Sequence, residues 1–119
     1  MNNLVGYKKL IAWEKADELA HKVYEMTSEF PKREIYGLTS QLRRAGLSVV
    51  ANIIEGHGRY NKNEFRHFLS LALGSLAEAG YYLEFAFKRK YLTEKEFSEV
   101  DGLRQECGRL LWKLHQSQK

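Results

Sequence analysis

The chain contains very little cysteine and proline. Among its 119 residues there is one cysteine, Cys107, and one proline, Pro31. A single cysteine excludes an internal disulfide. Because Cys107 falls within a helical pattern of leucines, we expect a small packed side chain and not a nucleophile. Helical geometry is disfavoured immediately before a proline, so Phe30-Pro31 predicts the end of a first helix.

The sequence also lacks any long apolar run. No stretch approaches the length of a membrane-spanning helix, and residues 1–9 lack the apolar centre of a signal peptide. We therefore expect a cytoplasmic protein with no membrane partner. The excess of basic residues is small: 19 basic and 15 acidic residues give a net charge of +4, which permits binding to phosphate backbones without demonstrating it.

Apolar residues recur with a helical period throughout, and no segment shows the alternation of a strand. The motifs at Asn61–Glu64 and Thr93–Glu96 are typical of capping boxes that open helices. Four helices are predicted, over about 8–28, 34–59, 61–90 and from 93 onward. Long helices with short connections, in a chain of this length, predict a single all-α domain over 1–119: an up-down-up-down antiparallel four-helix bundle.

Three of these predicted helices are apolar on two separate faces. At about 100° of turn per residue, each helix has one stripe that we expect in the core. In chain order the core stripes are Ile11, Leu19, Val23 and Met26; Leu38, Leu42, Ala45, Val49, Ile53 and Gly56; and Phe65, Phe68, Leu69, Ala72, Leu76, Ala79, Leu83 and Ala86. Behind them lie Trp13, Ala20 and Tyr24; Leu47, Val50 and Ile54; and Leu71, Gly74, Glu78, Tyr82 and Phe85.

A monomeric bundle covers only one face of each helix, and a soluble surface rarely leaves rows of large apolar side chains in water. The second stripes therefore predict a homo-oligomer. The expected interface residues are Trp13, Tyr24, Leu47, Val50, Ile54, Leu71, Glu78, Tyr82 and Phe85. Within the stripes Glu78 needs a partner, for which Arg43 or Arg44 of the same or a neighbouring subunit is a candidate. Asn52 is expected to fix the register between helices or subunits.

Two Glu-x-x-His pairs, Glu18/His21 and Glu64/His67, raise the alternative of a metal-dependent four-helix-bundle enzyme. On a helical wheel, however, the first pair and His67 point away from the core stripes, whereas bundle metal ligands must project inward. His57 lies between two glycines, but the glycine pattern and preceding strand of a nucleotide site are absent. We therefore expect no enzyme, no metal, no cofactor and no small-molecule substrate.

Basic residues gather near the predicted turn between the second and third helices. Arg59, Lys62 and Arg66 lie there beside Tyr60, and arginine with aromatic residues suits nucleic-acid contact. Arg43 and Arg44 are further candidates, although a neighbouring carboxylate could occupy one of them. The alternative is a solvated loop with salt bridges at an interface. RNA or single-stranded nucleic acid is the expected partner if these residues bind a ligand.

Three blocks of the sequence, preceded by Trp13 and Ala16, resemble a known family. They are Phe30-Pro-x-x-Glu34-x-Tyr36-Gly37-Leu38, Gln41-Leu-Arg-Arg-Ala45-x-x-Ser48 with Ala51-Asn52-Ile53-x-Glu55-Gly56, and Phe68-Leu69-x-x-Ala72-x-Gly74-Ser75. Together they look like the four-helix-bundle proteins encoded in 23S rRNA intervening sequences. Two departures, Val49-Val50 for the frequent Ile-Pro and Ile54 for alanine, keep the apolar character.

This resemblance implies a ring-like homo-oligomer, typically a pentamer. A distant relative of that family, the accessory protein of diversity-generating retroelements, forms a basic pentameric barrel that binds nucleic acid and reverse transcriptase. From the residues and the resemblance together we expect a non-enzymatic scaffold that binds RNA or a nucleic-acid-associated protein.

Overall fold

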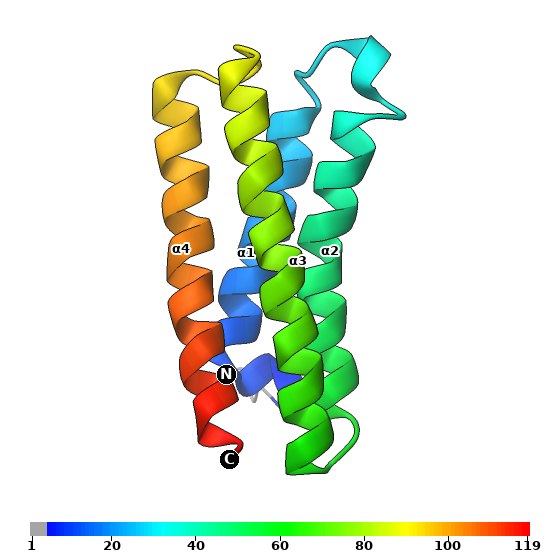
Figure 1. The fold of residues 1–119 in the computed structure, drawn as a ribbon, viewed down its shortest axis with the longest axis vertical. Helices are drawn as coiled ribbons and strands as arrows, with labels where there is room; N and C mark the ends of the chain where they lie inside the picture. Colours follow the sequence, from blue (N-terminus) through cyan, green and yellow to red (C-terminus); the bar gives the residue numbers. More distant parts are fainter. Residues whose placement is uncertain (1–4) are drawn as a thin grey trace.

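The computed structural model describes residues 5–119 and contains four long helices (Figure 1). They are α1 (Ile11–Thr27), α2 (Leu38–His57), α3 (Lys62–Lys88) and α4 (Glu94–Ser117), with two short 3₁₀ helices, η1 (Gly6–Lys9) and η2 (Lys32–Glu34). This described range contains no strand, which confirms the all-α class. It also contains no helix long and apolar enough to cross a bilayer. Residues 1–4, part of the stretch considered as a signal peptide, lie outside the described residues.

The two predicted caps open their helices. Thr93 Oγ1 accepts a hydrogen bond from the Glu96 amide at 3.1 Å, and Glu96 Oε1 accepts one from the Thr93 amide at 2.8 Å, which completes the capping box of α4. At α3 only half of the predicted box is confirmed. Asn61 Oδ1 accepts from the Glu64 amide at 3.0 Å, but the Glu64 carboxylate lies 3.8 Å from Arg59 instead of reaching back.

Several helix boundaries differ from the prediction. The first helix begins at Ile11 and not near residue 8, because η1 and an extended Leu10 precede it. The second helix begins at Leu38 and not near Glu34, because η2 and a non-helical Gly37 come between. Glu34 Oε1 then accepts a hydrogen bond from the Leu38 amide at 3.2 Å. The third helix ends at Lys88, since Lys90 adopts a φ of 65° and turns the chain away.

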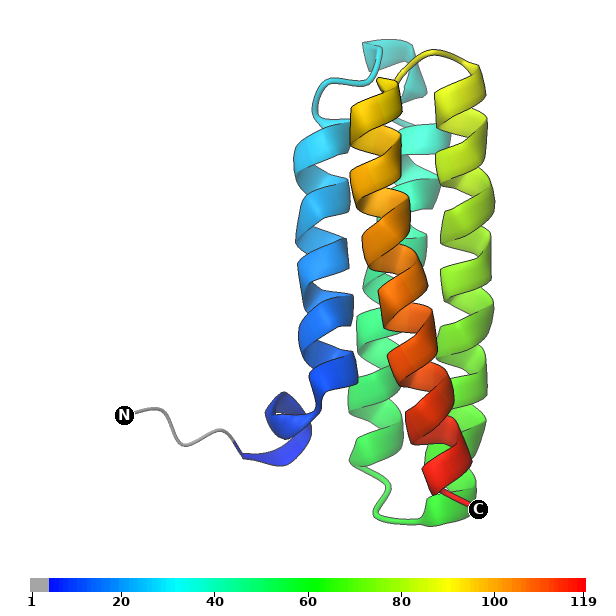
Figure 2. The same ribbon diagram turned by 90° about the vertical axis from the view of Figure 1, so that its left-hand side faces the viewer.

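The helices run antiparallel to their neighbours in the order α1, α2, α3, α4 around the bundle (Figures 1 and 2). Each helix packs against two others, and within residues 5–119 no Cα atoms of the diagonal pairs come within 8 Å of each other. The α1–α2 and α3–α4 connections lie at one end. The α2–α3 turn lies at the other end, together with the start of α1 and the end of α4 (Figure 2).

The core follows the predicted stripes closely on α2 and α3, where every stripe residue is at least partly buried. On α1 two assignments were wrong. Ile11 is 60% exposed, and Ala20 is buried instead of lying behind the core face. The buried face of α1 contains Ala12, Ala16 and Ala20 beside the predicted Leu19, Val23 and Met26. At Ala20 the small side chain lets α2 approach closely. A Cβ placed on Gly46 of α2 would lie 3.7 Å from Ala20 Cα.

Gly56 permits a second close approach, between the end of α2 and the start of α3. A Cβ on Gly56 would lie 2.7 Å from Phe68 Cβ and 3.0 Å from Phe65 Cδ1. The absence of a side chain at Gly56 therefore allows α2 and α3 to pack closely here. The contact fixes how tightly the α2–α3 turn closes, and hence where Arg59 and the residues after it are placed.

Candidate oligomer and nucleic-acid interfaces

The apolar residues predicted behind the core fall into two groups in the structure. In the first group the side chains stay in water: Tyr24, Leu47, Leu71 and Phe85 are 41% to 48% exposed. They come from α1, α2 and α3. Ile54 is half-buried and lies on the same side of α2 as Leu47. These residues remain available to a partner.

The second group already packs within the protomer. Trp13, Val50 and Tyr82 are half-buried and lie against the bundle's own core. Their positions flank the core stripes, so a neighbouring helix covers part of each one. The Trp13 ring also meets Tyr7 of η1 edge-on at 5.4 Å, and its buried Nε1 has no hydrogen-bond partner within residues 5–119. Any interface role of these three is therefore confined to their uncovered edges.

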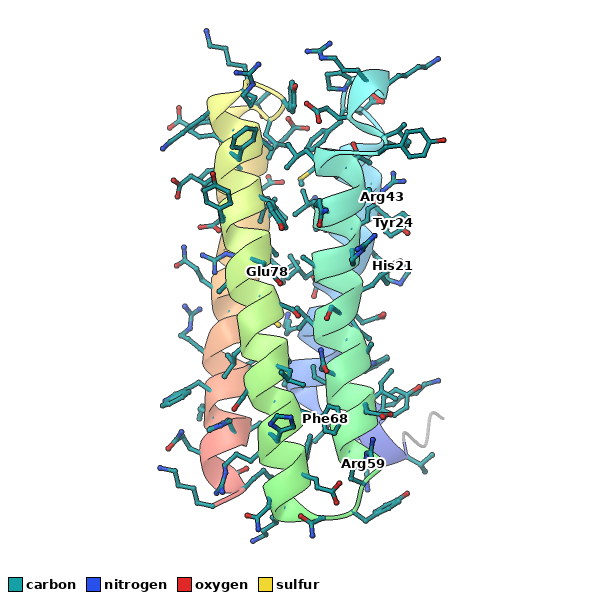
Figure 3. All side chains as sticks on the ribbon, turned by 45° about the vertical axis from the view of Figure 1, so that its right-hand side comes forward. His21, Tyr24, Arg43, Arg59, Phe68 and Glu78 are labelled. Carbon is teal, nitrogen blue, oxygen red and sulfur yellow. The ribbon has the colours of Figure 1, made fainter. Side chains whose placement is uncertain are left out.

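Arg43 holds α2 to α1. Its Nε donates to Thr27 Oγ1 at 2.8 Å, and its guanidinium carbon lies 4.3 Å from the centre of the Tyr24 ring (Figure 3). The possibility that Arg43 pairs with Glu78 in the same chain is thus wrong. Arg44 and Glu78 are both exposed, and within the described chain neither lies within 4 Å of an opposite charge. Pairing between subunits stays a prediction.

A shallow depression lies beside Arg44 on the α1–α2 surface. It is lined by Tyr24, Ser40, Arg43, Arg44, Leu47, Ser48 and Ala51. Its lining joins exposed apolar surface to the unpaired charge of Arg44. The α3 ridge, defined by Leu71, Glu78 and Phe85, offers exposed apolar side chains around an unpaired carboxylate. One surface is a depression beside an exposed arginine, and the other is a helix ridge that contains an exposed glutamate. The two surfaces therefore match in shape and in charge.

The basic turn between α2 and α3 is partly neutralised by its own carboxylates. Arg59 pairs with Glu55 at 2.8 Å, lies 3.8 Å from Glu64, and stacks over the Phe68 ring at 5.2 Å (Figure 3). Lys62 is exposed and has no carboxylate within 4 Å in the described part of the chain. Arg66 donates only to the neutral Asn63 Oδ1, at 3.3 Å. Arg66 and Lys62 are thus freer than Arg59 to meet a phosphate.

Polar groups between α2 and α3 satisfy one another. Asn52 Nδ2 donates to the Ser48 carbonyl at 2.9 Å and to Ser48 Oγ at 3.2 Å, and Ser48 Oγ shares a hydrogen bond with Ser75 Oγ at 2.8 Å. The network crosses from one helix to the other. Asn52 itself bonds only within α2, and Ser48 makes the crossing, so the register-fixing role of Asn52 between helices or subunits stays a prediction.

The two Glu-x-x-His pairs do not meet in the interior. Glu18, His21, Glu64 and His67 are all exposed, and His21 lies 3.6 Å from Asp17 on the outside of α1 (Figure 3). Residues 5–119 contain no group of three potential ligands placed to hold a metal ion. Cys107 is fully buried, and burial raises the pKa of its thiol to about 12, as suits the predicted packed side chain.

The sequence did not predict one feature of this region, a contact between the end of α4 and the first half of α3. Near the end of α4 the rings of Trp112 and His115 stack at 5.4 Å with an angle of 6° between their planes. His115 Nε2 shares a hydrogen bond of 3.0 Å with Ser70 Oγ of α3. The available signal was the absence of acidic residues from 107 to 119, where basic residues persist.

A family model described as the 23S rRNA-intervening sequence protein matches residues 8–113. The chain belongs to this family. Among solved structures, this chain shares its fold with a protein of unknown function from the S23 ribosomal protein family of Bacteroides thetaiotaomicron. That neighbour has a TM-score of 0.81 and 22% sequence identity, and the match covers 89% of this chain and 96% of the other. Comparison with curated proteins finds no match.

Proposed function

We propose that this chain is a non-enzymatic scaffold that assembles with copies of itself into a ring, with five as the expected number, and binds RNA or a nucleic-acid-associated protein. The observation that carries the proposal is the row of exposed apolar side chains on three adjacent helices. Tyr24, Leu47, Leu71 and Phe85 stay 41% to 48% exposed although the bundle has a complete core without them. Burying each in a contact is worth up to about 1.5–3 kcal/mol.

The two complementary surfaces favour a head-to-tail contact. The α1–α2 depression of one copy would receive the α3 ridge of the next, with Arg44 placed to pair with Glu78. A contact between two different surfaces repeats from copy to copy, and it closes into a ring when the rotation permits. The resemblance to ring-forming proteins supports this choice over an open chain.

Light scattering tests the assembly. The wild-type protein is expected to have a mass of about five times the 13.9 kDa of one chain at micromolar concentration. Leu47→Asp should dissociate it, because an unpaired carboxylate in an apolar contact is costly. Leu47 suits this test better than Val50, which packs on the protomer's own core. A monomeric wild-type protein would end the proposal.

Ile35→Asp is the matched control. Ile35 is exposed to the same 48% as Leu47 but lies in the α1–α2 connection, outside both proposed surfaces. The control should keep the oligomer. If both variants dissociate it equally, the contact lies elsewhere. Circular dichroism of each variant shows whether the bundle itself is intact.

The nucleic-acid part of the proposal rests on the exposed cations of the α2–α3 turn. Phosphate contacts from Lys62 and Arg66, repeated in each subunit, would add by multivalency, and affinity should fall steeply with salt. Replacing Arg59, Lys62 and Arg66 with alanine is expected to weaken binding of structured RNA or single-stranded DNA while the oligomer persists. Metal analysis of the purified protein checks the non-enzymatic part: stoichiometric iron or manganese would contradict it.

A further inference from the structure

Acidic residues are absent from two segments that lie side by side on the neighbouring helices α3 and α4. Neither residues 65–77 in the first half of α3 nor residues 107–119 at the end of α4 contain an aspartate or glutamate. The same segments contain Arg66, Arg109 and Lys113, all at least partly exposed. Two separate stretches of sequence thus contribute charge of one sign to one end of the α3–α4 surface.

The structure joins these segments directly. Ser70 Oγ, one turn after Arg66, meets His115 Nε2 at 3.0 Å. The ring of His115 in turn lies flat against Trp112, with 5.4 Å between the ring centres. Arg109 lies three residues before Trp112 and therefore on the same side of α4. Arg66 of α3 and Arg109 of α4 thus lie on the two helices that the Ser70–His115 bond joins, and Lys113 follows one turn after Arg109 on the outer side of α4.

The charges on this surface are not used inside the protomer. Within residues 5–119 neither Arg109 nor Lys113 has a carboxylate within 4 Å. The acid that comes just before them, Glu106, is held 3.4 Å from Lys15 of α1. Arg66 donates to an uncharged amide. In contrast, Arg59 in the α2–α3 turn is paired with Glu55 at 2.8 Å.

Trp112 is the unusual member of the group. It is 55% exposed, whereas a tryptophan in a folded protein is normally largely covered. His115 covers one face of the indole, and the exposed fraction leaves surface for a second flat partner. Base–aromatic stacking accepts any base, because every base has a π face.

We propose that the α3–α4 basic face, defined by Arg66, Arg109, Trp112, Lys113 and His115, binds a single-stranded nucleic acid. Its phosphates lie against the three cations, and one base stacks on Trp112. A single strand fits because its bases are free to leave the stack, whereas those of a duplex are not. This inference rests on the proposed nucleic-acid function and names its ligand and its principal surface.

The proposed ring leaves this face accessible. The subunit contact uses residues of α1, α2 and α3, and none of α4. Rotation about a symmetry axis preserves height along that axis, so every copy of the face lies at one level of the ring. A strand that reaches from one copy to the next gains affinity from each additional contact.

Fluorescence anisotropy with labelled 20-nucleotide oligouridine and oligodeoxyuridine, which differ only in the sugar, tests the inference at low salt with the full chain. Trp112→Ala is expected to weaken binding about tenfold. Arg109→Ala/Lys113→Ala should weaken it at least as much and flatten the slope of log K against log salt by about 0.7 for each lost phosphate contact. Similar affinity for the two oligomers identifies backbone and base as the ligand, and preference for one identifies its sugar.

Lys32→Ala/Arg33→Ala is the matched control. It removes one lysine and one arginine, both exposed, from the opposite end of the bundle, and should change affinity by less than about twofold. Intrinsic fluorescence adds a direct readout, since the chain has two tryptophans. In a Trp13→Phe background the remaining emission comes from Trp112, and stacking of a base should quench it.

The outcomes separate this inference from the proposed function. If the wild type binds but the Trp112 and Arg109/Lys113 variants bind equally well, while Arg59→Ala/Lys62→Ala loses binding, the ligand lies at the α2–α3 turn and the inference fails alone. If heparin displaces the labelled oligonucleotide and Trp112→Ala does not change the affinity, the face is a general polyanion surface and the proposed base stacking is wrong. If no oligonucleotide binds at low salt, the inference and the nucleic-acid function fail together, and light scattering still decides the scaffold.

Discussion

The Tyr91 hydroxyl donates a hydrogen bond to Glu34 Oε2 across 2.8 Å and ties together two connections that are 57 residues apart in the sequence. The Tyr91 ring also lies 5.4 Å from that of Phe30. Glu34 uses its other oxygen to accept from the Leu38 amide at the start of α2. One carboxylate therefore holds three parts of this end of the bundle.

Because of this hydrogen bond, we expect the free energy of unfolding to depend on pH in the acidic range. The Tyr91 hydroxyl, followed by the Leu38 amide, holds the pKa of Glu34 below its ordinary value. The folded state therefore favours the carboxylate, so the stabilisation is present above the ordinary pKa and is lost as the pH falls through the lowered one. Tyr91→Phe should lower the urea midpoint at about pH 7 and much less at about pH 3. Tyr81→Phe, at an exposed tyrosine of α3, should change neither midpoint.

Gly56→Ala is expected to destabilise the bundle by about 1–3 kcal/mol, because the new methyl group would overlap Phe68 and Phe65. The control is Gly102→Ala on α4, where a Cβ meets nothing within 4 Å. That change should stabilise the helix by about 0.5–1 kcal/mol. Urea unfolding measures both. Equal effects of the two substitutions would show that the α2–α3 contact yields without cost.

Lys90→Gly should raise the free energy of unfolding by about 1 kcal/mol. Lys90 has a φ of 65°, in the left-handed region that costs a residue with a side chain roughly 1–2 kcal/mol and costs glycine little. Ala77→Gly, in the exposed middle of α3, should have the opposite sign, about 0.5–1 kcal/mol of destabilisation. A loss of stability in Lys90→Gly would mean that the lysine side chain contributes more than its backbone costs.

Cys107 should resist thiol reagents in the native state. Its pKa of about 12 reduces the thiolate fraction near pH 8 about a thousandfold from that of an ordinary thiol, and burial blocks access as well. The thiol is favoured in the folded state, so stability should fall as the pH rises above about 9. Ellman's reagent should react promptly only in denaturant. Cys107→Ala/Ser98→Cys, which moves the thiol to an exposed position, should react at once in the folded protein.

Local signals in the sequence proved the most informative. The Thr93 box and the Asn61 cap act over three residues, so their chemistry is visible in the order of side chains alone. The stripes of α2 and α3 were likewise predictable, because long leucines and phenylalanines repeat on one face. The helix count and the all-α class follow from these two kinds of signal.

Relationships between distant segments were harder to predict. On α1 the buried face includes alanines, and an alanine is equally acceptable in the core and in water. The burial of Ala20 follows from the close approach of Gly46 on α2, which the order of residues in α1 does not reveal. Arg43 looked available because its partner Thr27 lies 16 residues earlier on another helix. The contact of Ser70 with His115 spans 45 residues, so the α3–α4 basic face exists only once the bundle has folded.

The even number of helices returns the chain to the end from which it set out, with the start of α1 and the end of α4 both near the α2–α3 turn (Figure 2). A purification tag after Lys119, at the end of α4, would therefore be tethered close to the surfaces proposed to bind nucleic acid, and a polyhistidine tag would add its own imidazoles there. Tag-free protein is the right material for the binding experiments. A fluorophore attached at Tyr36, which is 94% exposed in the connection at the opposite end, would report on the particle without touching that region.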